Sequence, residues 1–580
     1  MQHFVDSMII RAYPEYKHNT KYRLGKQPKS SKVVASLDEC LSIALKVSHV
    51  GTLDFAALLE RANEQTRQRA MYRQAILYPE TIAFNLRDFG RSHLLADDAE
   101  NLVACGIASR VSEHDCALRP TRGYGRPFTI VEEKVNPLTG ETQRVRRFIL
   151  WPKEHNRWAA KQGYQAFLPE LQHFSSYANH VLFEAATIRD LRLSFYQLEI
   201  PLSARALYRF CDLAGNLYEA RRGVMGHSCM PEDMQMTAAI IAGDPNYCKP
   251  EFALFMPART VWIDNIRLCG SHDDAMRAAA KLDEAASQLR VTWKPSDSLT
   301  NCTQYEFLGA AWNHDDSSIS LSVKLQGKIP LLCPETMRVS EMESTIGRLV
   351  NAAGILQIPL GTFYPAMKWY RRIQNKIGRG VLTRADCIIV PKLARYSLGA
   401  WLDAARTTTF FPREKLQQAS GEATLVTDAS LYGFGGILIS PLQEIFVVGG
   451  KWICPQIPDS INELEASAVL IALHQFQGVW PSINVRQLNI VVDNTSVRDT
   501  LAKGSSKSER LNRIILMILN TIKDIGFMVT IRYIPTDLNP SDSISRGRIP
   551  DWATFSDELA TWMNLRQGEG AAGIRSRVLP

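Results

Sequence analysis

Four acidic residues in the C-terminal third of the chain lie where apolar segments end or begin: Asp428, Glu465, Asp493 and Asp542. A single acid at such a place is usually a turn former or a helix cap. Four carboxylates gathered at one edge of a sheet would instead repel one another, and their pKa values would rise. Divalent cations remove that repulsion, and oxygen ligands favour Mg²⁺ or Mn²⁺. Two such ions, about 4 Å apart, can activate a water and stabilise the leaving oxygen of a phosphodiester.

The segments around these acids predict a mixed sheet covered by helices. Runs rich in Val, Ile, Leu and Phe predict strands at 423–428, 435–440, 444–452, 487–494 and 527–535. A helix with a broad apolar face follows the third strand, and we expect Asn462 to cap it. A second helix begins near Ser508 and is closed by Gly526.

The order of these motifs resembles the ribonuclease H domains of retroelements. The matching segments are TDAS, ELEASAVLIAL, VVDN and YIPTDLNPSDSISR, and they fall within 416–550. The match through AVLIAL makes Glu465, rather than Glu463, the counterpart of the family's catalytic glutamate. The resemblance implies that Asp428, Glu465, Asp493 and Asp542 are catalytic and bind two metal ions. Many family members carry a His before the last Asp that assists product release. IPTDLNPSD has none, which bears on turnover rate rather than on the chemistry.

A second pair of acids lies in the middle of the chain. Asp190 is found in TIRDLRLSFYQLEIPL, and Asp264 lies between two apolar segments in RTVWIDNIRLCGS, the outline of a hairpin with an acid at its turn. Two Asp on adjacent strands can share metal ions and bind a nucleoside triphosphate, whose transferring phosphate must be neutralised.

These two segments resemble motifs A and C of reverse transcriptases, which implies that Asp190 and Asp264 are catalytic metal ligands. Between them, RRGVMGHSCMPEDMQ resembles the segment that supports template and nucleotide, with Gly226 and Pro231 at matching positions. Upstream, RVRRFIL resembles a fingers strand, and Arg146 aligns with the arginine that contacts the triphosphate. Downstream, YEFLGAAWN resembles the primer-grip region.

The resemblance gives Phe195 a specific role and also shows one departure. In the family an aromatic ring at this position excludes a 2′-hydroxyl and selects deoxynucleotides, whereas an ordinary core Phe beside Tyr196 is the alternative. The family's second motif C acid is replaced here by Asn265, a neutral and weaker oxygen ligand. We therefore expect an active polymerase whose metal affinity or metal preference is altered.

The composition is that of an ordinary globular protein with a mild basic excess. The 580 residues carry a formal net charge of +8, with 46% hydrophobic and 22% charged residues, and the length predicts about three or four domains. No apolar run is long enough to span a membrane, and the N-terminus does not read as a secretory signal. The eleven cysteines form no CxxC pair, which argues against a zinc site and a disulfide scaffold. We expect an intracellular protein, cytoplasmic or nuclear and not secreted, with no membrane partner.

The predicted fold is a multidomain α/β and α+β protein, in which a right-hand polymerase with fingers, palm and thumb precedes a ribonuclease H-like mixed sheet with helices. The expected boundaries are an N-terminal extension and start of the fingers (1–110), fingers and palm (111–295), thumb and helical connection (296–415), ribonuclease H domain (416–550) and a C-terminal helix and tail (551–580).

The resemblance implies a reverse transcriptase with ribonuclease H activity, which copies retroelement RNA into DNA and degrades the RNA strand of the hybrid. Its partners would be an RNA template, a DNA primer, the RNA–DNA hybrid and deoxynucleoside triphosphates, with two Mg²⁺ or Mn²⁺ per active site. Without a protease, zinc-knuckle or integrase motif, the combination resembles the tyrosine-recombinase (DIRS-type) retroelements. Two alternatives stay open: a domesticated RNA-binding scaffold, and a ribonuclease H on an inactive palm.

Overall fold

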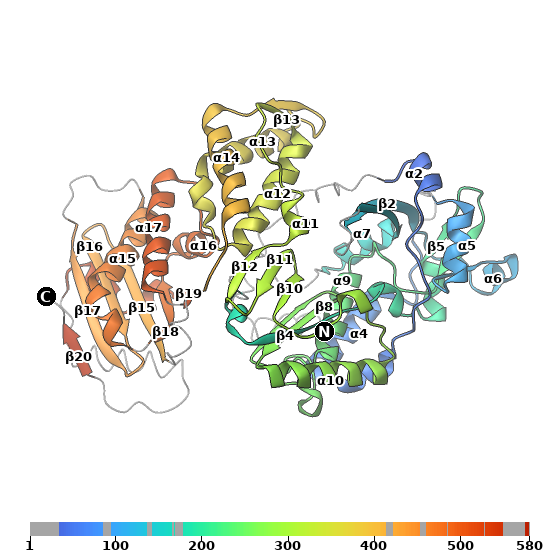
Figure 1. Ribbon diagram of the computed structural model, residues 1–580, viewed down its shortest axis with the longest axis horizontal. Coiled ribbons are helices and arrows are strands. Elements are labelled where there is room, and N and C mark those ends of the chain that lie inside the picture. The colour runs from blue at the N-terminus through green and yellow to red at the C-terminus, as the bar shows by residue number, and fades with distance from the viewer. Residues whose placement is uncertain are drawn as a thin grey trace. The chain divides into compact units, whose positions relative to one another are not determined.

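The computed structural model describes residues 34–84, 94–135, 142–164, 168, 178–412, 421–452, 460–483, 485–526, 528–548 and 575–578. The chain forms a mixed α/β structure with several separate sheets, divided into two compact units (Figure 1). Unit 1 comprises Met1–Pro169 and Ala185–Cys302, and unit 2 comprises Glu170–Glu184 and Thr303–Pro580. Within the described ranges, every helix is too short or too polar to cross a bilayer.

Unit 1 is centred on a four-stranded antiparallel sheet of order β7-β8-β4-β9. Its strands are β4 (Ala185–Asp190), β7 (Ala258–Trp262), β8 (Asn265–Gly270) and β9 (Leu299–Cys302). Helices α9 (Met230–Ile241) and α10 (His272–Leu289) pack against it, and their apolar residues share one core with Ile266 and Leu268 of β8. Buried alanines and leucines line one side of α10. It begins at a capping box between Ser271 and Asp274, which satisfies the first backbone N–H groups.

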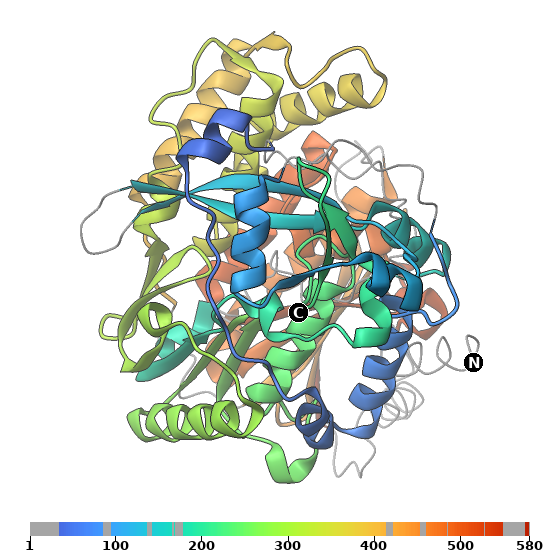
Figure 2. The ribbon, with the colours of Figure 1, turned by 90° about the vertical axis from the view of Figure 1, so that its right-hand side faces the viewer.

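The rest of unit 1 surrounds this sheet with a long hairpin, a small sheet and short helices. Strands β2 (Arg126–Val135) and β3 (Thr142–Trp151) form an antiparallel ribbon, which lies at the end of the unit opposite α10 (Figure 2). The small sheet has the order β1-β6-β5, with bounds Ala108–Arg110, Leu217–Ala220 and Arg209–Cys211. The helices are α2 (Leu37–Ser42), α3 (Phe55–Arg61), α4 (Glu64–Leu77), α5 (Ala96–Ala104), α6 (Glu113–Leu118) and α7 (Lys153–Lys161).

Unit 2 begins with a small sheet and a group of helices. Its strands are β10 (Gln304–Phe307), β11 (Ala310–Asn313) and β12 (Ser318–Leu321), with a separate pair β13 (Thr336–Arg338) and β14 (Cys387–Ile389). The helices are α11 (Val323–Gln326), α12 (Val339–Ile355), α13 (Tyr364–Gly378) and α14 (Lys392–Thr407). Helix α12 buries one apolar face, which includes Met342, Ile346 and Leu349.

The C-terminal part of unit 2 is a six-stranded mixed sheet of order β19-β18-β15-β16-β17-β20. The strands are β15 (Gly421–Ala429), β16 (Gly433–Ile439), β17 (Glu444–Lys451), β18 (Val485–Val492), β19 (Met528–Tyr533) and β20 (Arg575–Val578). Strands β15, β16 and β17 form an antiparallel meander, whereas β18 runs parallel to both β15 and β19. The predicted mixed sheet is confirmed.

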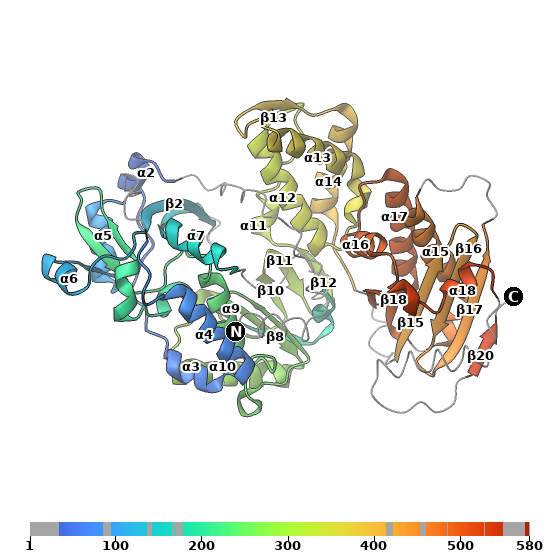
Figure 3. The same ribbon diagram turned by 180° about the vertical axis from the view of Figure 1, so that it is seen from behind.

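Helices cover both faces of this sheet. Helices α15 (Ile461–Gln475) and α17 (Glu509–Ile525) share a core with Leu425 on one face, and α16 (Thr495–Lys503) follows β18. The neighbouring residue Val426 points to the other face, as strand geometry requires, into a cluster that includes Ile544 of α18 (Asp542–Ser545). Figure 3 shows α18 on the face turned away from the viewer in Figure 1.

Two details differ from the sequence-based expectations. The α15 N-cap is Ser460 and not Asn462, which lies inside the first turn and accepts a hydrogen bond from Asn494 at 2.9 Å. Of the expected C-terminal helix and tail (551–580), the described residues include only Arg575–Val578, which form a strand that pairs with β17. The predicted end of α17 is confirmed, since Gly526 has a φ of +88° as its C-cap.

Candidate metal centre

Strands β15 and β18 bring two acids to one edge of the sheet. Thr427 pairs with Val492 in the parallel register, so Asp428 and Asp493 follow at the same end. Gly435 pairs with Asp428 on the other side, and a Cβ there would lie 2.7 Å from the backbone oxygen of Ser541. The small residue at 435 therefore lets the segment before α18 approach the acid closely.

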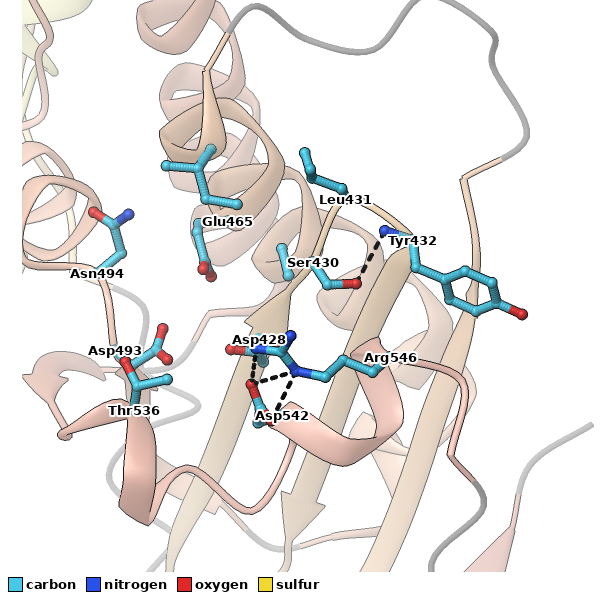
Figure 4. A pocket seen from close by; sticks show the side chains of 12 residues that line it. Asp428, Ser430, Leu431, Tyr432, Glu465, Asp493, Asn494, Thr536, Asp542 and Arg546 are labelled. Carbon is cyan, nitrogen blue, oxygen red and sulfur yellow. Dashed lines mark hydrogen bonds and ion pairs between the residues drawn. The ribbon is translucent and has the colours of Figure 1, made fainter.

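Helix α15 adds the third carboxylate. Glu465 lies on its buried side, and one carboxylate oxygen each from Asp428, Glu465 and Asp493 lies within 4.8 Å of the others. Figure 4 shows these side chains around a pocket of about 560 Å³, which Asp542 and Arg546 also line. Three of the four predicted acids thus form a close group, and the fourth borders the same pocket.

Two carboxylate oxygens of the three-acid group have no hydrogen-bond partner among the described residues. Asp428 and Glu465 are only 2% and 4% exposed, and Asp428 Oδ2 and Glu465 Oε2 are buried without a hydrogen-bond partner. Burial raises the pKa of Glu465 to about 9, and the charges of Asp493 and Asp428 add to the effect. Burial likewise raises the pKa of Asp428 to about 6, again with a contribution from Asp493.

This donor set fits a hard divalent cation. All its ligand atoms are carboxylate oxygens, which Mg²⁺ and Mn²⁺ prefer. A positive charge at their centre would give the buried oxygens Asp428 Oδ2 and Glu465 Oε2 the partner that they lack among the described residues. Among the described residues, this is the one group of three or more acidic, His or Cys side chains with that geometry.

Asp542 is arranged differently from the other acids. It is the first residue of α18, and Arg546 lies four residues later on the same face. Arg546 Nε donates to Asp542 Oδ1 and Oδ2 at 3.0 and 2.9 Å, and Nη2 donates to Oδ1 at 2.8 Å. The predicted fourth ligand is therefore occupied by an arginine, a partner that the sequence analysis did not single out although it lies within the quoted SDSISR.

Asn539 is a second residue that the sequence analysis missed. Its Nδ2 donates to the backbone oxygen of Thr427 at 3.1 Å and to Asp428 Oδ1 at 3.4 Å. Its Oδ1 accepts from the Ser541 hydroxyl at 2.6 Å. Asn539 is buried, so these bonds join the loop before α18 to the end of β15 and orient Asp428.

The second predicted pair of acids meets in unit 1. Asp190 ends β4 and pairs with Asn265, and Asp264 occupies the turn between β7 and β8. Ile263 in this turn has a φ of +54°, a strained conformation for a β-branched residue. The backbone N–H of Leu191 donates to the Asp264 backbone oxygen at 3.0 Å, which ties the two segments together. The expected hairpin with an acid at its turn is confirmed.

Both of these acids have protein partners. The Ser194 hydroxyl donates to Asp264 Oδ2 at 3.0 Å, and Asn265 Nδ2 donates to Oδ1 at 2.9 Å. Lys294 Nζ lies 3.6 Å from Asp190 Oδ2. Burial nevertheless raises the pKa of Asp264, although the bond from Ser194 opposes the shift.

The arginine expected to contact a triphosphate, Arg146, is bound to an acid of the protein. Arg146 is buried, and its Nη1 and Nη2 donate to the two carboxylate oxygens of Asp98 at 2.6 and 2.8 Å. The side chain of the next residue, Arg147, points to the other face of β3, as strand alternation requires. Arg147 pairs with Glu132 at 2.6 Å and its charge lowers the pKa of Asp264. Arg147 and Arg146 therefore point to opposite faces of the ribbon, and only Arg146 is held by Asp98.

The two remaining predicted nucleotide-site residues lie in the same unit. Gly226 has a φ of +136°, and a Cβ would lie 2.5 Å from the Leu150 backbone oxygen, so only glycine fits against β3. Phe195 lies in a short 3₁₀ turn (Ser194–Gln197), where it is half-buried and packs against the core of unit 1. This position is compatible with a core role and with a role beside a bound sugar.

The comparison with solved structures finds similar chains. No family model and no curated protein match. A foamy viral protease-reverse transcriptase in complex with RNA/DNA hybrid is 12% identical, with a TM-score of 0.43, over 90% of this chain and 65% of that one. Two others bound to double-stranded DNA have 12% and 11% identity, with TM-scores of 0.41 and 0.40. They cover 86% and 88% of this chain and 85% and 99% of theirs. With TM-scores below 0.5 the overlap in shape is partial, and function has to be inferred from this chain's own residues.

Proposed function

We propose that the protein is an RNA-directed DNA polymerase with ribonuclease H activity, encoded by a retroelement of the tyrosine-recombinase type. The observation that carries the nuclease part is the convergence of Asp428, Glu465 and Asp493 from three separate elements, with Asp542 beside them. Two buried carboxylate oxygens of this group have no hydrogen-bond partner among the described residues, and a bound cation would supply one.

In the nuclease site, bound divalent cations would supply the charge that activates a water and stabilises the departing oxygen. Asp428, Glu465 and Asp493 would hold those cations through their carboxylates. Asn539 keeps Asp428 in position through its contact at 3.4 Å. The pocket would receive the RNA strand of a hybrid, which A-form geometry and 2′-hydroxyl groups distinguish from DNA.

For the polymerase, we propose that 111–295 form fingers and palm, 296–415 the thumb and connection, and 416–550 the nuclease domain. Asp190 and Asp264 would bind the catalytic cations, and Phe195 would lie beneath the sugar of the incoming deoxynucleotide. Arg147 replaces Arg146 as the triphosphate contact in this proposal, because Arg146 is buried and bound to Asp98 whereas Arg147 points to the other face of β3.

The test is a pair of assays on the purified full chain, in Mg²⁺ and separately in Mn²⁺. Primer extension on an RNA template with deoxynucleotides measures the polymerase, and cleavage of a pre-annealed RNA–DNA hybrid measures the nuclease. We expect both activities, each lost in EDTA. Salt-sensitive RNA binding without either turnover would contradict the proposal and favour an RNA-binding scaffold.

One specific observation favours a second candidate, a ribonuclease H on an inactive palm. Asn265 replaces an acid and donates to Asp264, and Lys294 lies beside Asp190, so both palm acids have protein partners. Hybrid cleavage without primer extension in either metal would establish this candidate over the first.

A further inference from the structure

Asp542 differs from the other three acids because its carboxylate is bound to an arginine, Arg546. The Asp542 side chain is 31% exposed and is held by three hydrogen bonds from Arg546, whereas the three-acid group has no such bonds to an arginine or lysine among the described residues. Figure 4 shows the Asp542 carboxylate directed at the guanidinium. A carboxylate engaged in this way has few lone pairs left for a cation.

The pairing is a property of the short helix α18 and does not need bound substrate. Residues four apart lie on the same face of a helix, so Asp542 and Arg546 meet as soon as this turn forms. The Arg546 side chain is 52% exposed, and it lines the same pocket as Asp428, Glu465 and Asp493. An anion that enters the pocket can therefore reach the guanidinium.

The chemistry of the proposed substrate supplies that anion. A guanidinium binds a phosphate through two parallel N–H···O bonds in the geometry that it uses for a carboxylate. An RNA strand lying in the pocket would bring phosphates within reach of Arg546. Two anions, the Asp542 carboxylate and a backbone phosphate, would then compete for the Arg546 guanidinium.

We propose that Arg546 keeps Asp542 away from the three-acid group in the absence of substrate. When a strand binds, one of its phosphates replaces the Asp542 carboxylate on the Arg546 guanidinium, and the released Asp542 becomes the fourth metal ligand. This inference rests on the proposed nuclease function. Arg546 is then a positioning residue that makes completion of the metal site depend on substrate. Without nucleic acid the site has three acids available, which limits non-productive metal loading.

The inference is tested by Mn²⁺ binding, measured from the electron paramagnetic resonance signal of the unbound ion. In the absence of nucleic acid, Arg546→Gln should bind Mn²⁺ about fivefold more tightly than the natural protein, because Asp542 is released. A short hybrid with a 2′-O-methyl RNA strand should tighten Mn²⁺ binding by the natural protein and have little effect on the variant. Arg546→Lys should fall between the two, since Lys lacks the planar fork.

A matched control is available on α17, where Arg513 pairs with Glu509 four residues earlier at 3.1 Å, away from the pocket. Arg513→Gln should bind Mn²⁺ as the natural protein does. If Arg546→Gln also binds Mn²⁺ as the natural protein does while that protein cleaves hybrid, the gating role is wrong and the nuclease function stands. If the natural protein neither binds Mn²⁺ at this site nor cleaves hybrid, both proposals are overturned.

Discussion

The two acidic sites of this chain differ in whether their carboxylates have partners within the protein. In unit 1, Asp264 accepts from Ser194 and Asn265, and Asp190 lies beside Lys294. In unit 2, Asp428 and Glu465 each keep a buried carboxylate oxygen without a partner. A site with built-in partners is complete without an ion, whereas a site with unpartnered carboxylates is stable only when protonated or loaded.

This difference leads to separate expectations for the two proposed activities. The nuclease site should depend steeply on the cation for stability as well as for catalysis. The polymerase site should depend on it mainly for catalysis, because its acids already have protein donors.

The largest expected effect is on the nuclease. Asp493→Asn removes a charge from the three-acid group, and hybrid cleavage should fall by about 10³-fold or more. Primer extension should stay within about twofold of the natural protein, because the site in unit 1 is unchanged. Asp499→Asn, a nearby acid that pairs with Arg498 at 2.7 Å, is the control and should leave both rates unaltered. Equal loss of both activities would contradict the separation of the two sites.

The reciprocal change lies in unit 1. Asp264→Asn should reduce primer extension by about 10³-fold with hybrid cleavage retained, since Asp264 is the acid at the hairpin turn in the proposed palm. Asn265→Asp adds the missing acid, and it should change the relative rates in Mg²⁺ and Mn²⁺. If Asp264→Asn extends primers at the natural rate, this pair of acids is not the polymerase site.

Substitution of two neighbouring arginines of β3 should have different effects, one on the stability of the fold and the other on nucleotide binding. Arg146→Gln leaves the Asp98 carboxylate buried without its cation, and should lower the free energy of unfolding by about 3 kcal/mol. Arg147→Gln should leave the unfolding temperature nearly unchanged and raise the KM for deoxynucleotides about tenfold. Thermal unfolding and primer extension would be measured on both variants. If Arg146→Gln is stable and has a raised KM for deoxynucleotides, Arg146 rather than Arg147 is the triphosphate contact.

Alkaline pH should destabilise unit 2 when no metal is present. The folded pKa of Glu465 is raised to about 9, above its value in the unfolded chain, so its contribution to stability is fully present below about pH 4.5 and is lost as pH rises toward 9. In EDTA at pH 8, Glu465→Gln should therefore raise the free energy of unfolding by roughly 2 kcal/mol, with little gain at pH 5. Added Mg²⁺ should stabilise the natural protein more than the variant.

Acid pH should destabilise unit 1 instead. His155 and His227 are buried with ring centroids 4.5 Å apart; burial lowers the pKa of His155 to about 4 and lowers that of His227 as well. Because the unfolded chain takes up these protons near pH 6.5, stability present above that pH is lost as pH falls toward 4. His227→Gln should reduce this loss by about 1.4 kcal/mol per pH unit, as chemical denaturation at pH 5 and 7 would measure. An unchanged slope would contradict it.

Much of the arrangement follows from local patterns in the sequence. Apolar runs predict β15, β16, β17 and β18, and an acid at the end of a run lies at a sheet edge wherever the sheet is placed. Gly526 ends α17 as expected, because a left-handed C-cap is a local property of glycine. The position of Glu465 near the start of α15 could also be predicted, because the apolar spacing that follows it marks where the helix runs.

The remaining features depend on contacts between distant segments. Arg146 and Arg147 are adjacent and chemically equal in the sequence, and only the packing of β3 against Asp98 directs the first inward. Likewise, the helical spacing of Asp542 and Arg546 could be read from the chain, but their position beside the other acids could not.

The sequence by itself therefore determined which acids are available and where along the chain they stand. Only the tertiary structure decided which carboxylates have a partner and which have none. The physical reason is that hydrogen bonding and burial of a charged group depend on every segment packed around it, as Asn539 and Asp428 show.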